Sequence, residues 1–269
     1  MDFYRLLRIP VFALYALFFY GNVYGTDSVD INGNNEVKIS LGKSKAVFKA
    51  DDIIKIKLCD KYYKSEFFVQ NDKRADVYRN NGLVIYKQEI EDKKRNIFIN
   101  FTVNFELQER EIKVTSQVDI DSEDYIIKEV SMPALEFYYP DESVYACYYP
   151  SGMGKRVEDL ENLSKVGFSY PGDNGTMQWY TMNSAKNGIY IGTHDDSQQP
   201  KTFEIYRREK GRIVSELKMP VHSDKFQSPA MIVRLYEGSW HEAARFYRTW
   251  YDTRFRVVDS PDWNRRGLC

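Results

Sequence analysis

The sequence predicts an all-β fold, a large antiparallel sandwich of two sheets with one helix near the C-terminus. Apolar and polar residues alternate with period two over long stretches, and turn-forming pairs separate these stretches. Near residue 240 the apolar residues instead recur every three or four positions, which is typical of a helix. The 269 residues suffice for one large β domain or two small ones, and 43% hydrophobic and 15% aromatic content excludes a disordered chain. Long strands with one polar face and no intervening helices indicate two sheets that cover each other.

Residues 1–25 have the pattern of a signal peptide. Arg5 and Arg8 form a positive start, residues 9–20 form an apolar run, and Gly25 is the small residue that a signal peptidase needs. Because the run is shorter than the roughly 20 residues of a spanning helix, we expect cleavage after Gly25 and no membrane span afterwards. The expected location is the periplasm, the cell surface or the medium, and an uncleaved N-terminal anchor is the alternative.

The sandwich is predicted to occupy residues 26–237, and its clearest part is a long hairpin. Every odd position from Ile97 to Leu107 is apolar, and the pattern resumes at positions 112, 114, 118 and 120. The turn pairs Asn81-Gly82, Asn187-Gly188 and Lys210-Gly211 are predicted to separate shorter strands. These strands are predicted at Val37–Leu41, Leu83–Ile90, Tyr125–Val130, Gly188–Gly192, Thr202–Arg207, Ile213–Met219 and Met231–Tyr236.

A capped amphipathic helix is predicted to follow residue 238. Ser239 and Glu242 have the S-x-x-E spacing of a capping box. The spacing of three and four places six residues on one stripe: Trp240, Ala243, Ala244, Tyr247, Trp250 and Tyr251. This stripe needs a cover, which is either the same domain or a second domain. If a second domain were missing, the large aromatic residues would form an exposed apolar patch.

Charge and cysteine content exclude several classes of function. Lys plus Arg number 38 and Asp plus Glu number 39, so we expect no nucleic-acid partner. Cys59, Cys147 and Cys269 form no C-x-x-C pair, and the histidines have no second histidine at ligand spacing, so we expect neither a metal site nor a cofactor. Cys59 and Cys147 are either bridged in an oxidising compartment or buried as free thiols.

The loop and strand around residue 179 are the best candidate for carbohydrate contact. Trp179 and Tyr180 are large amphipathic aromatic residues that could stack on a sugar face, while Gln178 could bond its hydroxyl groups. Aromatic residues on strands also commonly form the core.

His194 and Asp195 form a second candidate, because they come directly after a predicted strand. A loop histidine beside an aspartate could act as a general acid–base pair or form part of a metal site. We also expect both residues among the carbohydrate contacts. Asp at a strand end also favours a simple turn. No catalytic residue is assigned.

Four motifs together carry a resemblance to a known group of proteins. They are Tyr170-Pro171-Gly172 with Met177-Gln178-Trp179-Tyr180, residues 188–195, residues 238–250, and Ser260-Pro261-Asp262-Trp263. The chain thereby resembles the N-terminal part of exported bacterial glycoside-hydrolase-like proteins that carry the domain of unknown function numbered 6259. The resemblance implies a β-supersandwich, similar to the galactose-mutarotase-like fold, a helical linker and a (β/α)8 barrel that would hold the catalytic carboxylates.

The resemblance implies that residues 238–269 are the linker helix and the start of a barrel that the 269 residues do not include. The chain is therefore expected to be a fragment, a sandwich module that packs on the barrel in cis and contributes to weak glycan binding, and not a competent hydrolase alone. Two alternatives stay open. One is a mutarotase-like or lyase-like enzyme centred on His194, and the other is a structural or adhesive surface module.

Overall fold

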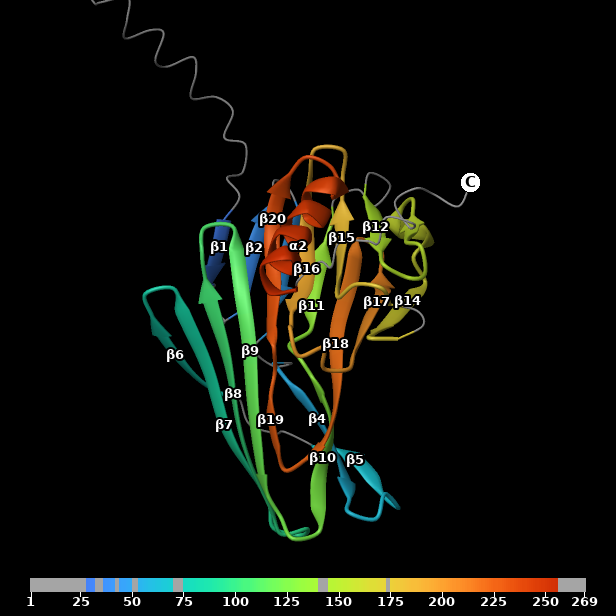
Figure 1. Ribbon diagram of the computed structural model, residues 1–269. Helices are drawn as coiled ribbons and strands as arrows, with labels where there is room; N and C mark the ends of the chain where they lie inside the picture. Colours follow the sequence, from blue (N-terminus) through green and yellow to red (C-terminus); the bar gives the residue numbers. More distant parts are fainter. Residues whose placement is uncertain are drawn as a thin grey trace, which may run out of the picture.

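The computed structural model describes residues 28–31, 36–41, 44–49, 53–69, 75–139, 145–172 and 175–255. The expected signal peptide and residues 256–269 lie outside these ranges. Within them the chain forms two ten-stranded sheets and one α-helix, which confirms the all-β sandwich with a C-terminal helix (Figure 1). Strand pairing is antiparallel throughout the described residues.

The first sheet, called sheet A here, has the strand order β1-β2-β3-β11-β18-β10-β4-β5, and β17 and β14 extend it from β18. Its strands are β1 (Ser28–Ile31), β2 (Val37–Leu41), β3 (Ser44–Phe48), β4 (Lys55–Asp60), β5 (Glu66–Phe68), β10 (Tyr125–Ser131), β11 (Leu135–Tyr138), β14 (Lys165–Tyr170), β17 (Lys201–Glu209) and β18 (Arg212–Ser223).

The second sheet, sheet B, has the order β13-β12-β15-β16-β20-β9-β8-β7-β6, with β19 paired to β9. Its strands are β6 (Asp76–Asn80), β7 (Leu83–Asp92), β8 (Ile97–Leu107), β9 (Glu111–Asp121), β12 (Ala146–Tyr149), β13 (Lys155–Val157), β15 (Trp179–Asn183), β16 (Asn187–His194), β19 (Lys225–Gln227) and β20 (Ala230–Glu237). A short 3-10 helix, η3, spans Leu160–Asn162.

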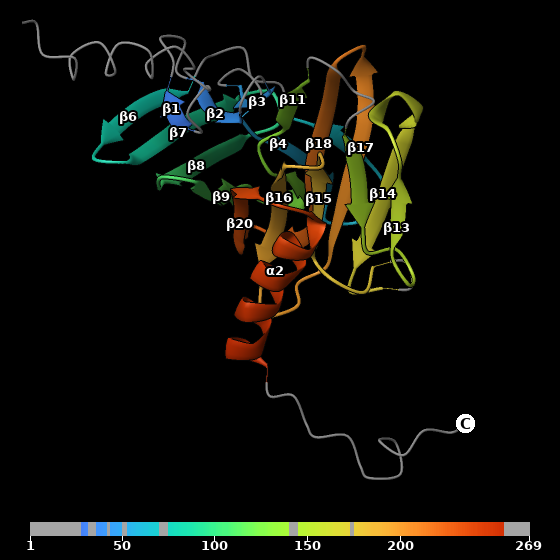
Figure 2. The same ribbon diagram turned by 90° about the horizontal axis from the view of Figure 1, so that it is seen from above.

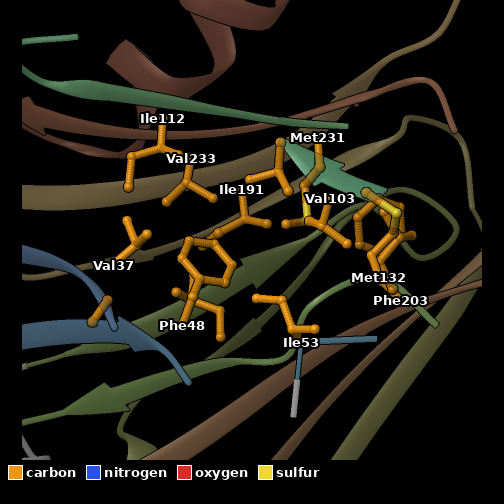
Figure 3. Close-up of a cluster of buried hydrophobic side chains, with 14 of the residues drawn as sticks. Val37, Phe48, Ile53, Val103, Ile112, Met132, Ile191, Phe203, Met231 and Val233 are labelled. Carbon is orange, nitrogen blue, oxygen red and sulfur yellow. The ribbon is translucent and has the colours of Figure 1, made fainter. Parts of the chain in front are cut away.

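The main core lies between the two sheets, because the inward residues of both sheets are apolar. In β8 the odd positions from Ile97 to Phe105 are buried and the even positions are more exposed, as the period-two pattern predicts. Figure 3 shows Phe48 and Ile53 of the sheet A side near Val103 and Ile191 of sheet B. All four side chains are at most 4% exposed.

Helix α2 (Trp240–Arg254) forms a third layer on the outer face of sheet B (Figure 2). Ala243 and Tyr247 of α2 are buried against Trp179, Tyr190 and other residues of β15, β16 and β20. The chain's own sheet therefore covers the central part of the aromatic stripe. Of the two covers expected for the stripe, the same domain is the one found for Tyr247, whose exposed fraction is 4%, so this residue is not part of an exposed patch.

Two local predictions are corrected by the structure. The Ser239 side chain does not cap the helix, because its Oγ lies 2.9 Å from Nδ1 of His241. Asn187 and Gly188 begin β16 instead of forming the turn. The turn lies just before them, and the backbone N–H of Ser184 closes it by donating to the backbone oxygen of Asn187 at 2.8 Å. Gly188 is needed inside the strand because a Cβ atom there would collide with the Tyr236 hydroxyl.

Candidate functional site

The five candidate residues are brought together where β15 begins and β16 ends, beside α2. Gln178 precedes β15, Trp179 and Tyr180 open it, and His194 closes β16 with Asp195 directly after it. In the register of these strands Trp179 lies opposite Gly192. The side chains alternate between the outer face under α2 and the inner side of the sandwich.

Trp179 lies on the outer face and anchors α2. Its ring stacks on Tyr190 with centroids 5.8 Å apart and lies 6.1 Å from the ring of Tyr247. Its indole Nε1 donates to Sδ of Met177 at 3.4 Å. With an exposed fraction of 5%, Trp179 is a packing residue in this structure.

His194 belongs to the same outer cluster. Its ring stacks on Trp250 with centroids 4.7 Å apart and an interplanar angle of 8°, and it lies 5.3 Å from Phe246. Its Nε2 is 3.2 Å from the Tyr190 hydroxyl. Burial lowers the pKa of His194 to about 4, so the ring is neutral at pH 7.

Tyr180 points the other way, into the main core. Its hydroxyl donates a hydrogen bond to Ser215 Oγ of sheet A, and its ring packs edge-on against Phe168 and Phe203. Burial raises the pKa of the Tyr180 hydroxyl far above its usual range. This residue ties the two sheets together.

Gln178 and Asp195 form a buried polar network with Lys201, which opens β17. The Gln178 amide Oε1 accepts from Thr193 Oγ1 at 2.7 Å and from Lys201 Nζ at 3.0 Å, while its Nε2 donates to the Asp195 backbone oxygen at 2.8 Å. Burial raises the pKa of the Tyr247 hydroxyl of α2 to about 12, and Gln178 beside it partly offsets this rise. The network therefore connects sheet A, sheet B and the helix.

The carboxylate of Asp195 has four donors. Lys201 Nζ lies 2.6 Å from Oδ2, the backbone N–H of Gln199 donates to the same oxygen, and Ser197 donates through its N–H and its hydroxyl to Oδ1. Burial alone would raise the pKa of Asp195, but the bonds from Lys201 and Ser197 hold it below its usual range. Asp195 thus fixes the loop between β16 and β17 and neutralises a buried lysine.

His194 and Asp195 do not act as a pair. Because neighbouring residues at the end of a strand point to opposite sides, the imidazole contacts Tyr190 and Trp250 whereas the carboxylate contacts Lys201. The suggestion of a general acid–base pair from adjacency in the sequence is therefore wrong. Sugar contact at the five predicted residues stays a prediction, and four of them, Gln178, Trp179, Tyr180 and Asp195, are at most 5% exposed in this structure.

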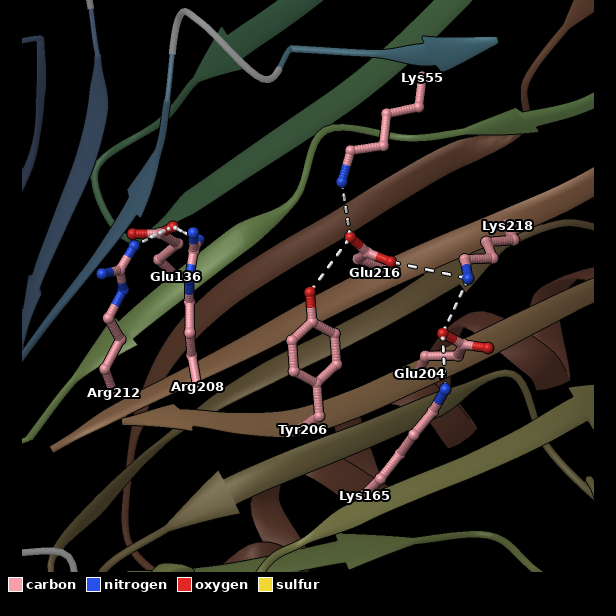
Figure 4. A network of polar contacts seen from close by, with 9 residues as sticks. All are labelled: Lys55, Glu136, Lys165, Glu204, Tyr206, Arg208, Arg212, Glu216 and Lys218. Atoms are coloured by element: carbon pink, nitrogen blue, oxygen red, sulfur yellow. Dashed lines mark hydrogen bonds and ion pairs between the residues drawn. The ribbon is translucent and has the colours of Figure 1, made fainter. Parts of the chain in front are cut away.

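The outer face of sheet A carries ion pairs (Figure 4). Glu136 is nearly buried and contacts Arg212, Arg208 and Lys49, while the Tyr138 hydroxyl donates to it at 2.6 Å. Burial alone would raise the pKa of Glu136, but these donors outweigh it and lower the pKa to about 2. A second chain of contacts on the same face runs through Lys165, Glu204, Lys218, Glu216 and Lys55.

The remaining sequence candidates have simple structural roles. Cys59 in β4 and Cys147 in β12 are buried free thiols. Among the described residues no group of three or more His, Cys, Asp or Glu is placed to hold a metal ion. Within the same residues no helix has the length and apolar character needed to cross a membrane.

The similarity to known proteins is a similarity of fold. No family model and no curated protein matches the chain. An α-N-acetylgalactosaminidase from Bifidobacterium bifidum, solved with GalNAc, matches with a TM-score of 0.59 and 11% identity over 85% of this chain and 38% of that one. The GH36 α-galactosidase AgaB from Geobacillus stearothermophilus matches with a TM-score of 0.51 and 6% identity over 86% of this chain and 44% of its own length.

These identities show a common fold and nothing finer. The chain spans less than half the length of both hydrolases. Its sandwich is therefore of a kind that occurs as part of glycoside hydrolases. The finer resemblance to proteins with the domain of unknown function numbered 6259 stays a prediction.

Proposed function

We propose that this chain is a non-catalytic β-sandwich module of an exported glycoside-hydrolase-like protein and that it contributes to carbohydrate binding. The observation that supports this most is the match of 85% of the chain to part of an α-N-acetylgalactosaminidase. A supporting role agrees with the chemistry of the candidate residues. Asp195 and Glu136 are held in ion pairs, and His194 is a neutral ring packed against α2.

The proposed module has a partner in cis, a (β/α)8 barrel joined to it through α2. As a linker, α2 would have a fixed direction relative to the sandwich, because it packs on sheet B with Tyr247 buried between the helix and the strands. Mass spectrometry of the native polypeptide tests this part of the proposal. Peptides that continue beyond Cys269 into a barrel sequence would support it, and a native C-terminus at Cys269 would remove it. The same measurement at the N-terminus tests cleavage after Gly25.

Carbohydrate binding is tested with the purified chain on an array of neutral and acidic glycans, followed by calorimetry. Micromolar to millimolar binding of at least one glycan by the folded protein is the expected result. GalNAc is included because the similar hydrolase from Bifidobacterium bifidum was solved with it. If the folded chain binds no glycan and sugars leave its melting temperature unchanged, a structural or adhesive module is the better interpretation.

A further inference from the structure

A groove of about 340 Å³ lies between α2 and the β20 side of sheet B. Three arginines from separate elements line it: Arg110 in the turn between β8 and β9, Arg234 in β20, and Arg245 in α2. The volume lies at the lower end of the range of roughly 300 to 1,000 Å³ typical of small-ligand sites. The groove is therefore of a size for one sugar residue and not for a long chain.

Each arginine is held in place by a glutamate. The contacts are Arg110 Nη2 to Glu237 Oε1 at 2.9 Å, Arg234 Nη1 to Glu111 Oε2 at 3.3 Å, and Arg245 Nη1 to Glu242 Oε1 at 2.8 Å. A guanidinium group carries five N–H donors, and each of these contacts uses one nitrogen. The arginines are thus oriented by their glutamates and have further donors to offer a ligand.

The floor of the groove is aromatic, and its Phe246 ring also holds the Arg234 guanidinium in place. The Arg234 guanidinium lies 4.3 Å from the centroid of the Phe246 ring, and Phe246 packs edge-on against Tyr190 at 5.0 Å. Phe246 is partly buried and Tyr190 is fully buried. Such a floor excludes water below the guanidinium, which strengthens its bonds to an anion.

The further N–H donors of the three arginines favour an acidic ligand over a neutral one. Each arginine is paired with one glutamate, so the charges of these ion pairs balance, and the preference comes from the guanidinium donors and not from a net charge. Arginine binds a carboxylate through two parallel N–H bonds, whereas glutamates accept bonds from hydroxyl groups. A ligand that combines a carboxylate with several hydroxyl groups matches both kinds of residue.

We propose that this groove binds a carboxylated sugar residue, a hexuronate, with its carboxylate on the arginines and its hydroxyl groups on Glu237 and Glu242. This inference rests on the proposed carbohydrate function and names the class of sugar and its place. It locates binding in residues that the sequence did not single out. The sugar then lies between α2 and β20, in a groove that none of Gln178, Asp195 and Lys201 lines.

The test is calorimetry of the purified chain with trigalacturonate, compared with an uncharged trigalactoside. Arg245→Gln is expected to weaken trigalacturonate binding by about tenfold or more, since a charge-assisted bond is lost. The matched control is Arg248→Gln, because Arg248 is similarly exposed on α2 and pairs with Asp252, but does not line the groove. Both variants keep all buried residues, and circular dichroism verifies that they fold.

The outcomes separate this inference from the proposed function. Loss of trigalacturonate binding in Arg245→Gln and its retention in Arg248→Gln support the groove. Equal binding by Arg245→Gln and the parent chain, or binding of neutral glycans alone, overturns the groove and leaves the carbohydrate function standing. A folded chain that binds no sugar of either kind overturns both.

Discussion

The Lys201 ammonium lies 2.6 Å from the Asp195 carboxylate in a place where both side chains are closed to solvent, with exposed fractions of 0% and 3%. Lys201 also contacts the Gln178 amide, and its Nζ lies 5.4 Å from the centroid of the Tyr170 ring. A buried charge needs such partners because its desolvation is costly. The pair therefore sets how β16, β17 and α2 meet.

Replacing one partner of this pair should destabilise the chain strongly. Lys201→Met leaves the Asp195 carboxylate buried without its counter-charge, and we expect a loss of about 3 to 5 kcal/mol in the free energy of unfolding. Urea unfolding followed by tryptophan fluorescence measures it. The control is Arg248→Gln, which removes the exposed pair with Asp252 and should cost less than about 0.5 kcal/mol. Similar losses in the two variants would contradict a structural role of the buried pair.

Glu136 should make the stability depend on acid pH. Its pKa is lowered to about 2 in the folded chain, against 4.5 as the ordinary value, so its ionised form stabilises the fold above pH 4.5. This contribution, on the order of 3 kcal/mol, should be lost as the pH falls from 4.5 to 2. Glu136→Gln should be less stable than the parent chain at pH 6, and the difference should shrink towards pH 2. Urea midpoints measured between pH 2 and 6 decide this.

His194 should make the stability of the chain depend on pH between about 4 and 6.5. Because burial lowers its folded pKa to about 4, the folded chain binds fewer protons than the unfolded chain between pH 4 and 6.5. Its contribution to stability is complete above pH 6.5 and declines as the pH falls to 4, by on the order of 1 to 3 kcal/mol. His194→Gln should lack this slope. An imidazole titration midpoint near 6.5 in an NMR experiment would show that the ring is not shielded by Trp250.

Tyr247 should hold α2 on the sheet through two separable effects. Tyr247→Phe keeps the ring against Trp179 and loses the hydroxyl beside Gln178, at a cost of about 1 kcal/mol. Tyr247→Ala also empties the ring's place and should cost about 3 to 5 kcal/mol. Amide hydrogen exchange across α2 measures both. Unchanged protection in Tyr247→Ala would mean that α2 is held by other contacts.

The sequence predicted the strands that alternate and missed those that do not. β8 was predicted with its observed ends, because its inward residues are apolar and its outward residues, with the exception of Phe98, are polar. All residues of β15 are buried, since one face contacts sheet A and the other lies under α2. Period two vanishes in such a strand. The short strands β5, β13 and β19 have three residues each and are too short to show any pattern.

The candidate site, too, was predicted from the sequence only in part. Trp179 on one side and His194 with Asp195 on the other were predicted as two separate candidates, and the structure brings them together. Adjacency in the chain could not show that His194 and Asp195 face different partners. Nothing in the sequence around Lys201 indicates that this lysine is buried. Its partner, Asp195, lies in the loop after β16, and the sequence does not show that the two side chains meet. Arg110 comes from a turn far earlier in the chain than Arg234 and Arg245, and the three arginines line one groove only because α2 packs on sheet B. Their convergence depends on tertiary structure.

The coverage of sheet B from both sides limits which substitutions the chain can accept. In β15, β16 and β20 a polar substitution enters either the core between the sheets or the layer under α2, so tolerance should be low at consecutive positions. In β8 only every second position should be sensitive, because its outward residues are more exposed. Among homologues, β15, β16 and β20 should therefore be the segments that change least and that align most readily across distant relatives.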